Sequence, residues 1–86
     1  MKAILCKTLG PPENLVLEEV EDPVAAENEA LVEVYAASLN FPDGLQIQGK
    51  YQFQPPLPFI PGSEIGGVIK SVGPNLKGFD IGDRVM

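Results

Sequence analysis

Residues 61–69 read Pro-Gly-Ser-Glu-Ile-Gly-Gly-Val-Ile, and two shorter stretches follow them, Val-Gly-Pro-Asn at 72–75 and Gly-Asp-Arg-Val at 82–85. Glycine is favoured where the backbone adopts a positive φ or passes close to another segment. The run from 65 to 72 is rich in β-branched residues, and its paired glycines permit a sharp bend or close packing inside a strand. This part of the chain therefore predicts a strand that is bounded by tight turns.

The remainder of the chain is divided into short segments by nine glycines and nine prolines, which is typical of a β-rich domain. We expect a turn at 73–75 and one short helix over 40–49, in which Pro42 suits the first turn and Gly49 the C-terminal end. The segment 31–38 is apolar on both faces, which predicts a central strand. The expected strands cover residues 2–7, 15–20, 31–38 and 65–72, and a further one begins at Ile81.

The segment 50–61 combines aromatic residues with prolines, and proline stiffens an extended backbone because it fixes φ and lacks the N–H donor. We expect its aromatic side chains to hold this loop on a small, partly open β-barrel. Cys6 lies in an apolar segment and the chain has no second cysteine. A buried structural thiol is therefore expected at this position.

Length and charge limit the classes of function. An 86-residue chain forms one small domain at most and buries roughly 60% of its unfolded surface. Its net charge of −6, without a basic stripe, argues against nucleic-acid binding. No apolar run approaches the roughly 20 residues of a membrane span, and the N-terminus lacks the features of a secretory signal. We therefore expect no nucleic-acid or membrane partner, and a cytoplasmic location.

The order and spacing of these motifs resemble the N-terminal GroES-like domain of zinc-free quinone oxidoreductases in the medium-chain dehydrogenase/reductase superfamily. The resemblance runs through the whole chain, and its further landmarks are residues 1–4, 10–15, 38–43, 49–51 and 58–64. It implies a mainly β fold, a GroES-like partly open β-barrel with one short helix that is incomplete at the C-terminus. Residues 1–86 would then be part of the substrate-side domain, and the Rossmann cofactor domain would be absent from this chain.

Related enzymes of this superfamily hold a catalytic zinc ion with Cys and His ligands. At the corresponding positions this chain has Asn40 and Ser63, and it contains no histidine. An amide and a hydroxyl do not replace a thiolate and an imidazole as zinc ligands. The resemblance therefore implies a site without metal.

For the intact protein, the resemblance implies NADPH-dependent reduction of a quinone or another α,β-unsaturated carbonyl by hydride transfer. Such a reaction needs an apolar slot, hydrogen-bond donors near the substrate oxygen and a positioned nicotinamide. The intact protein would be a homodimer, and residues 1–86 alone would be inactive. The alternatives are a trans-2-enoyl thioester reductase and a non-catalytic GroES-like binding module. The sequence leaves the physiological substrate and the number of electrons per step open.

Three residues match positions in the family's site, and each has a structural alternative. Asn40 would lie beside the nicotinamide ribose and the substrate carbonyl, or it would cap the helix that follows. Tyr51 would donate its hydroxyl to the substrate oxygen, or it would pack against the proline-rich loop. Phe41 would form a wall of the nicotinamide pocket, or it would belong to the core. Some relatives have a second tyrosine where this chain has Leu45. The resemblance then implies that a polar contact is lost, that substrate preference or oxygen stabilisation differs, and that Leu45 only shapes an apolar wall.

Glu64 and the glycines around it are interpreted as structural. A buried carboxylate needs a partner, and Arg84 is the expected one, through a charge-assisted pair. The glycines between 62 and 82 serve backbone geometry, because no Gly-x-Gly-x-x-Gly phosphate-binding motif follows a strand.

Overall fold

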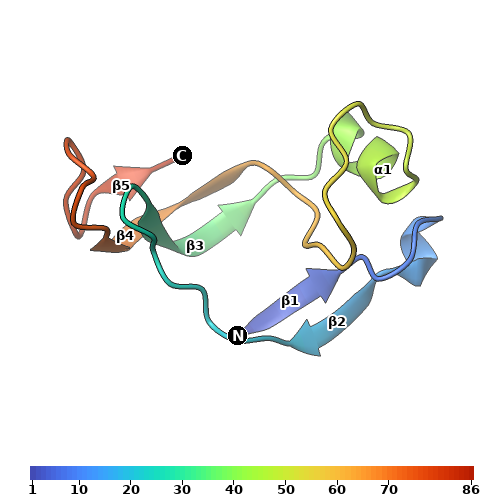
Figure 1. Ribbon diagram of the computed structural model, residues 1–86, viewed down its shortest axis with the longest axis horizontal. Coiled ribbons are helices and arrows are strands. Elements are labelled where there is room, and N and C mark those ends of the chain that lie inside the picture. Colours follow the sequence, from blue (N-terminus) through green and yellow to red (C-terminus); the bar gives the residue numbers. More distant parts are fainter. The chain divides into compact units, whose positions relative to one another are not determined.

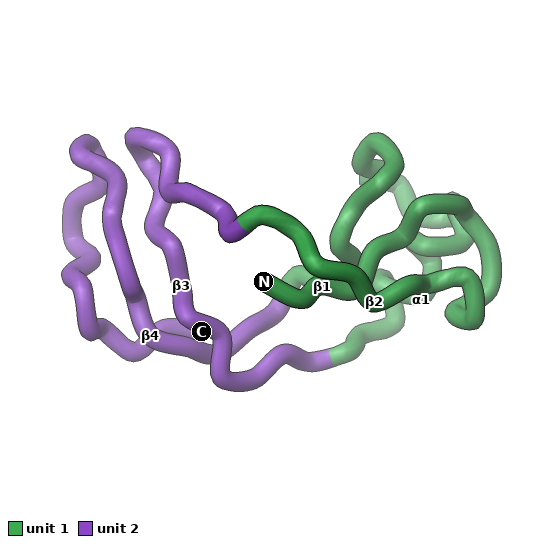
Figure 2. The backbone as a smooth tube through the Cα atoms, turned by 90° about the horizontal axis from the view of Figure 1, so that it is seen from below, with its two compact units in different colours: residues 1–21, 39–63 green, residues 22–38, 64–86 purple.

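A computed structural model describes residues 1–86 and shows a mainly β chain with one short α-helix (Figure 1). The strands form a two-stranded and a three-stranded sheet without closing into a barrel, and the predicted fold class is confirmed. The chain divides into two compact units: unit 1 is residues 1–21 with 39–63, and unit 2 is residues 22–38 with 64–86 (Figure 2). The elements are β1 (Lys2–Leu5), η1 (Pro12–Asn14), β2 (Val16–Glu19), β3 (Ala30–Ala37), α1 (Phe41–Ile47), β4 (Ile65–Val72) and β5 (Arg84–Val85).

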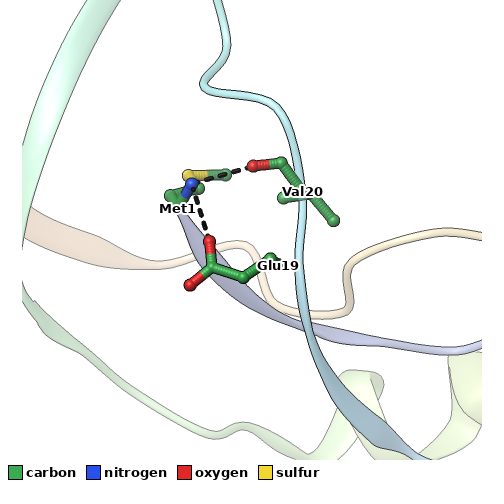
Figure 3. A network of polar contacts seen from close by, with 3 residues as sticks. All are labelled: Met1, Glu19 and Val20. Atoms are coloured by element: carbon green, nitrogen blue, oxygen red, sulfur yellow. Dashed lines mark hydrogen bonds and ion pairs between the residues drawn. The ribbon is translucent and has the colours of Figure 1, made fainter.

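In unit 1, β1 and β2 pair antiparallel, with Lys2 opposite Glu19. The amino group of Met1 extends this pairing by one step, because it donates to the carbonyl oxygen of Val20 at 2.8 Å. The same amino group lies 3.4 Å from a carboxylate oxygen of Glu19 (Figure 3). Both strands are slightly shorter than predicted, and a short 3-10 helix that was not predicted lies between them.

The core of unit 1 is built around Cys6, which is fully buried and packs with Ile47 and Phe59, while Leu15 covers this cluster. The backbones of Cys6 and Phe59 exchange two hydrogen bonds, at 2.8 and 3.1 Å. The prediction of a buried thiol is confirmed. So is the prediction that an aromatic side chain holds the proline-rich loop, although Phe59 alone is buried and Phe53 is 68% exposed.

Helix α1 is short but well defined at both ends. Asn40 occupies the N-cap, and its backbone N–H donates to the Asp43 carboxylate at 2.9 Å. Gly49 lies just beyond the last turn with φ +73°, and its N–H donates to the carbonyl oxygen of Gln46 at 3.1 Å. A positive φ at this position favours glycine, so the predicted C-terminal stop is confirmed.

In unit 2, β4 is the central strand, with β3 and β5 paired antiparallel on its two sides. The prediction that the segment 31–38 is central is therefore wrong. β3 is an edge strand of this sheet, and its Val34 and Tyr35 are 51% and 72% exposed. Apolar residues on both faces of a strand predict burial above and below it, but they carry no information about which strand lies beside it.

Gly67 lies in β4 opposite Val34 of β3 and Val85 of β5, and β3 comes especially close to it. A Cβ atom at Gly67 would collide with the carbonyl oxygen of Glu33 and with the side chain of Val32. Only glycine permits so close an approach. Of the two roles predicted for the glycine pair, a sharp bend or close packing, close packing is confirmed at Gly67.

The C-terminal strand is shorter than predicted. The turn expected at 73–75 is present, but the strand expected from Ile81 contains only Arg84–Val85. The residues before it form a turn, in which the Asp80 N–H donates to the Asp83 carboxylate at 2.9 Å. Aspartate competes for backbone donors in this way, so it favours turns over strands.

The α-helix has seven residues, whereas a membrane span takes about 20. None of the helices has the length and apolar character that crossing a bilayer requires.

Candidate functional site

Asn40 and Phe41 are neighbours at the N-terminal end of α1, where the chain turns from extended backbone into helix. The predicted capping role of Asn40 is confirmed by its place at the N-cap, with its backbone N–H held by Asp43. The ring of Phe41 is 80% exposed, so the alternative that it belongs to the core is wrong. The chain therefore presents an exposed aromatic ring directly after the N-cap residue of α1.

Tyr51 lies on the loop that follows α1, in the same unit as Asn40. This loop is tied back to the helix through Gln46: its side-chain amide donates to the carbonyl oxygen of Phe53 at 3.1 Å, and its own carbonyl oxygen accepts from the Gln54 side chain at 3.0 Å. Tyr51 is half-buried, and its hydroxyl takes part in no hydrogen bond of the chain. The ring is therefore partly packed while the hydroxyl is available as a donor.

Glu64 is exposed and has a different partner from the one predicted. The hydroxyl of Ser38 donates to its carboxylate at 2.7 Å, and the backbone N–H of Ser38 donates to its carbonyl oxygen at 3.2 Å. Arg84 forms no ion pair with it. Arg84 lies opposite Val68, four residues farther along β4, which is roughly 13 Å away at about 3.3 Å per residue.

The partnership of Ser38 and Glu64 follows from the register of the β3–β4 ladder. Ala37 is paired with Ile65, so the next residue outward on β3 meets the residue before β4. The two segments were both predicted as strands, but their mutual pairing was not. If the antiparallel pairing of 31–38 with 65–72 had been predicted, it would have placed Ser38 opposite Glu64.

Two open hollows were found, one in each unit, and the predicted site residues line neither of them. The hollow in unit 1 has a volume of about 400 Å³ and lies between Gly10–Pro12 and the end of α1, where Gln48 and Lys50 contribute the polar lining. The hollow in unit 2 has a volume of about 440 Å³ and is mostly apolar, with Glu29 as its single charged residue. Asn40 and Phe41 are exposed and Tyr51 is half-buried, and none of the three lines either hollow.

The donor set of the chain does not fit zinc. A zinc site takes thiolate, imidazole or carboxylate ligands that converge on one point. No group of three or more His, Cys, Asp or Glu side chains comes together in this way, and Cys6 is enclosed in the apolar core. The expectation of a metal-free site depends on this donor chemistry.

Comparison with known proteins finds a matching family model and similar proteins that cover almost the whole chain. Residues 26–86 match the family model of the alcohol dehydrogenase GroES-like domain. The acryloyl-coenzyme A reductase of Sulfurisphaera tokodaii is 43% identical over 86 residues, which cover 100% of this chain and 25% of that enzyme. The quinone oxidoreductase of Homo sapiens is 36% identical over 86 residues, covering 99% of this chain and 26% of its own length.

Among solved structures, quinone oxidoreductase from Escherichia coli in complex with NADPH is similar to this chain with a TM-score of 0.91 and 36% identity. The match covers 98% of this chain and 26% of that structure. The chain thus spans about a quarter of the length of the proteins that it matches.

Proposed function

The chain belongs to the alcohol dehydrogenase GroES-like domain family, and on that premise we propose that it is the N-terminal, substrate-side part of a zinc-free, NADPH-dependent reductase of quinones or other α,β-unsaturated carbonyls. The observation that carries the proposal is the similarity of 98% of the chain to a quinone oxidoreductase that binds NADPH. The Rossmann domain that binds most of the cofactor would lie outside residues 1–86.

The residues at the start of α1 suit the contact with the nicotinamide end of the cofactor. Asn40 offers an amide that both donates and accepts, and Phe41 offers an exposed aromatic face beside it. An amide can bond a ribose hydroxyl, and an aromatic face excludes water from a planar ring. In the bound state, NADPH would supply a hydride, which carries the two electrons that the acceptor gains.

Tyr51 suits the stabilisation of the acceptor. When a carbon of a quinone or enone gains a hydride, negative charge develops on the conjugated oxygen. A phenol held near that oxygen lowers the barrier by donating a hydrogen bond to the developing charge, and a proton from water completes the reduction. The unengaged hydroxyl of Tyr51, on a loop tied to α1, can serve as such a donor.

A second candidate function is favoured by the acryloyl-coenzyme A reductase, which is 43% identical to this chain. An enoyl thioester is reduced by the same hydride addition, and its carbonyl oxygen would need the same donors. A non-catalytic GroES-like module is the third candidate. Our proposal also includes a cytoplasmic, homodimeric intact enzyme that acts on a small molecule without nucleic acid or membrane.

The test is steady-state NADPH oxidation by the intact gene product, with 1,4-benzoquinone in one assay and acryloyl-coenzyme A in the other. Turnover that is faster with the quinone supports the first candidate, and turnover that is faster with the thioester supports the second. Absence of turnover with both acceptors contradicts the reductase and favours the binding module. The isolated 86-residue chain is the control and is expected to give no turnover.

A further inference from the structure

The chain passes from one unit to the other three times, after Glu21, after Ser38 and after Ser63. Two of these crossings lie beside a hydrogen-bonded pair of residues. Ser38 is the last residue before the second crossing, Glu64 is the first residue after the third, and their side chains are hydrogen-bonded. This pair, which we call the crossing clamp, consists of Ser38 and Glu64. It lies entirely within unit 2, at the open end of the β3–β4 ladder.

The clamp contains two hydrogen bonds of different kinds. The backbone bond, from the Ser38 N–H to the Glu64 carbonyl oxygen at 3.2 Å, continues the ladder by one step. The side-chain bond, from the Ser38 hydroxyl to the Glu64 carboxylate, is 2.7 Å long. Bonds from a hydroxyl to an ionised carboxylate are short and about twice as strong as neutral ones. The carboxylate thus adds a second bond at the end of the ladder.

The position of the clamp in the sequence gives it a consequence for the candidate site. Asn40 follows Ser38 by two residues, and two residues of extended chain span roughly 7 Å at most. Ser63 directly precedes Glu64, so the other crossing segment ends one residue before the clamp. The bond between Ser38 and Glu64 therefore holds two places in the chain: the one from which the chain continues to Asn40, and the one at which the chain arrives from Ser63.

We propose that Glu64 is a positioning residue for the Asn40 site, acting through its bond to Ser38 rather than by contact with the reacting atoms. The identity of the ligand that Asn40 contacts rests on the proposed function. The bonds between Ser38 and Glu64 are observed independently of that function. Both clamp residues are exposed, and neither belongs to the buried apolar core. Its loss should loosen the segment that leads to Asn40 without unfolding the chain.

The chain offers a matched control for the clamp. Asn75 donates its side-chain amide to the carboxylate of Glu27 at 3.3 Å, which is also an exposed side-chain pair within unit 2. It lies away from the two crossings that the clamp joins. Asn75→Ala should therefore remove a comparable surface bond without affecting the segment that leads to Asn40.

The first experiment measures amide hydrogen exchange of the 86-residue chain at each residue. The wild type is compared with four variants: Ser38→Ala, Glu64→Ala, Ser38→Thr and Asn75→Ala. The two alanine variants at the clamp should exchange about tenfold faster at residues 38–40, because a hydrogen bond to a charged group is lost. Residues 31–34 of β3 should be unchanged. Thr keeps the hydroxyl and suits a strand end, so Ser38→Thr should restore the slow exchange. Unchanged exchange in Glu64→Ala, or equal acceleration in Asn75→Ala, would overturn the proposal.

The second experiment measures kcat and KM of the intact gene product, with the acceptor that the assays above identify. Glu64→Ala and Ser38→Ala should lower kcat about tenfold, Ser38→Thr should recover it, and Asn75→Ala should leave it unchanged. A loss of kcat that Ser38→Thr does not recover contradicts a positioning role. If the wild type reduces neither acceptor, the proposed function fails, and the exchange experiment alone then decides about the clamp.

Discussion

The two units are stabilised in different ways. Unit 1 contains five of the six buried apolar residues, and its core joins β1, the end of α1 and the proline-rich loop through Cys6, Ile47 and Phe59. Unit 2 contains only Ile69 among these residues, and its sheet depends on backbone pairing and on glycines that let strands approach. Unit 1 is therefore stabilised mainly by side-chain packing, whereas unit 2 is stabilised mainly by main-chain pairing between its strands.

The largest expected effect tests the core of unit 1. Phe59→Ala should lower the free energy of unfolding by about 3–4 kcal/mol, because it leaves a cavity beside Cys6 and Ile47. Urea denaturation followed by circular dichroism measures this change. Phe53→Ala is the control, since that ring is 68% exposed on the same loop and should cost less than about 0.5 kcal/mol. Equal losses in the two variants would show that the cluster does not determine the stability of unit 1.

The next effect tests the main chain of unit 2. Gly67→Ala should destabilise the chain by about 2 kcal/mol, because the added Cβ collides with the carbonyl oxygen of Glu33. Gly44→Ala should have the opposite sign, since its Cβ meets nothing within 4 Å and alanine favours a helix by about 0.5–1 kcal/mol. Thermal unfolding of both variants measures the contrast. A stabilising Gly67→Ala would refute the close approach of β3 and β4.

The two tyrosines of the chain offer a comparison at the level of activity, one in each unit. Tyr51→Phe should lower kcat/KM of the intact reductase about tenfold or more, because a donor to the developing oxyanion is lost. Tyr35→Phe should leave it unchanged, since that ring is 72% exposed on β3. The measurement is NADPH oxidation at varied quinone concentration. If Tyr51→Phe matches the wild type, its hydroxyl has no part in the reaction.

The smallest effect compares two identical local contacts. The Asp43 carboxylate accepts the Asn40 N–H and the Asp83 carboxylate accepts the Asp80 N–H, each at 2.9 Å across three residues. Asp43→Ala should cost about 1 kcal/mol, because the contact belongs to a helix N-terminus. Asp83→Ala should cost no more than about 0.5 kcal/mol, because its turn is exposed and no helix depends on it. Chemical denaturation of the two variants resolves the difference, and a larger cost in Asp83→Ala would reverse the ranking.

Short-range patterns predicted much of the fold. The bounds of β4 were predicted as they are observed, because its β-branched residues and paired glycines are all local signals. The place of α1 followed from Pro42 and Gly49, and the burial of Cys6 followed from its apolar neighbours. The predictions for the site were less complete. The capping place of Asn40 was among them, but the exposure of Phe41 was left open.

Two of the predictions that failed concern partners that lie far apart in the sequence. The segment 31–38 was expected at the centre of a sheet, and Glu64 was expected to pair with Arg84. The segment 31–38 was correctly predicted to be a strand, and Glu64 was correctly predicted to have a partner. Which of several compatible neighbours they meet depends on register, and register is set by the whole sheet.

The sequence by itself determined where the helix and most of the strands and turns lie, and which ligand types the chain can offer a metal, because dihedral preferences and side-chain chemistry act within a few residues. Only the tertiary structure decided that β4 is flanked on both sides, that Phe59 covers Cys6, and that Ser38 bonds Glu64. Such pairings compete with alternatives of similar local free energy. Packing of distant segments selects among them, and no short stretch of sequence contains that information.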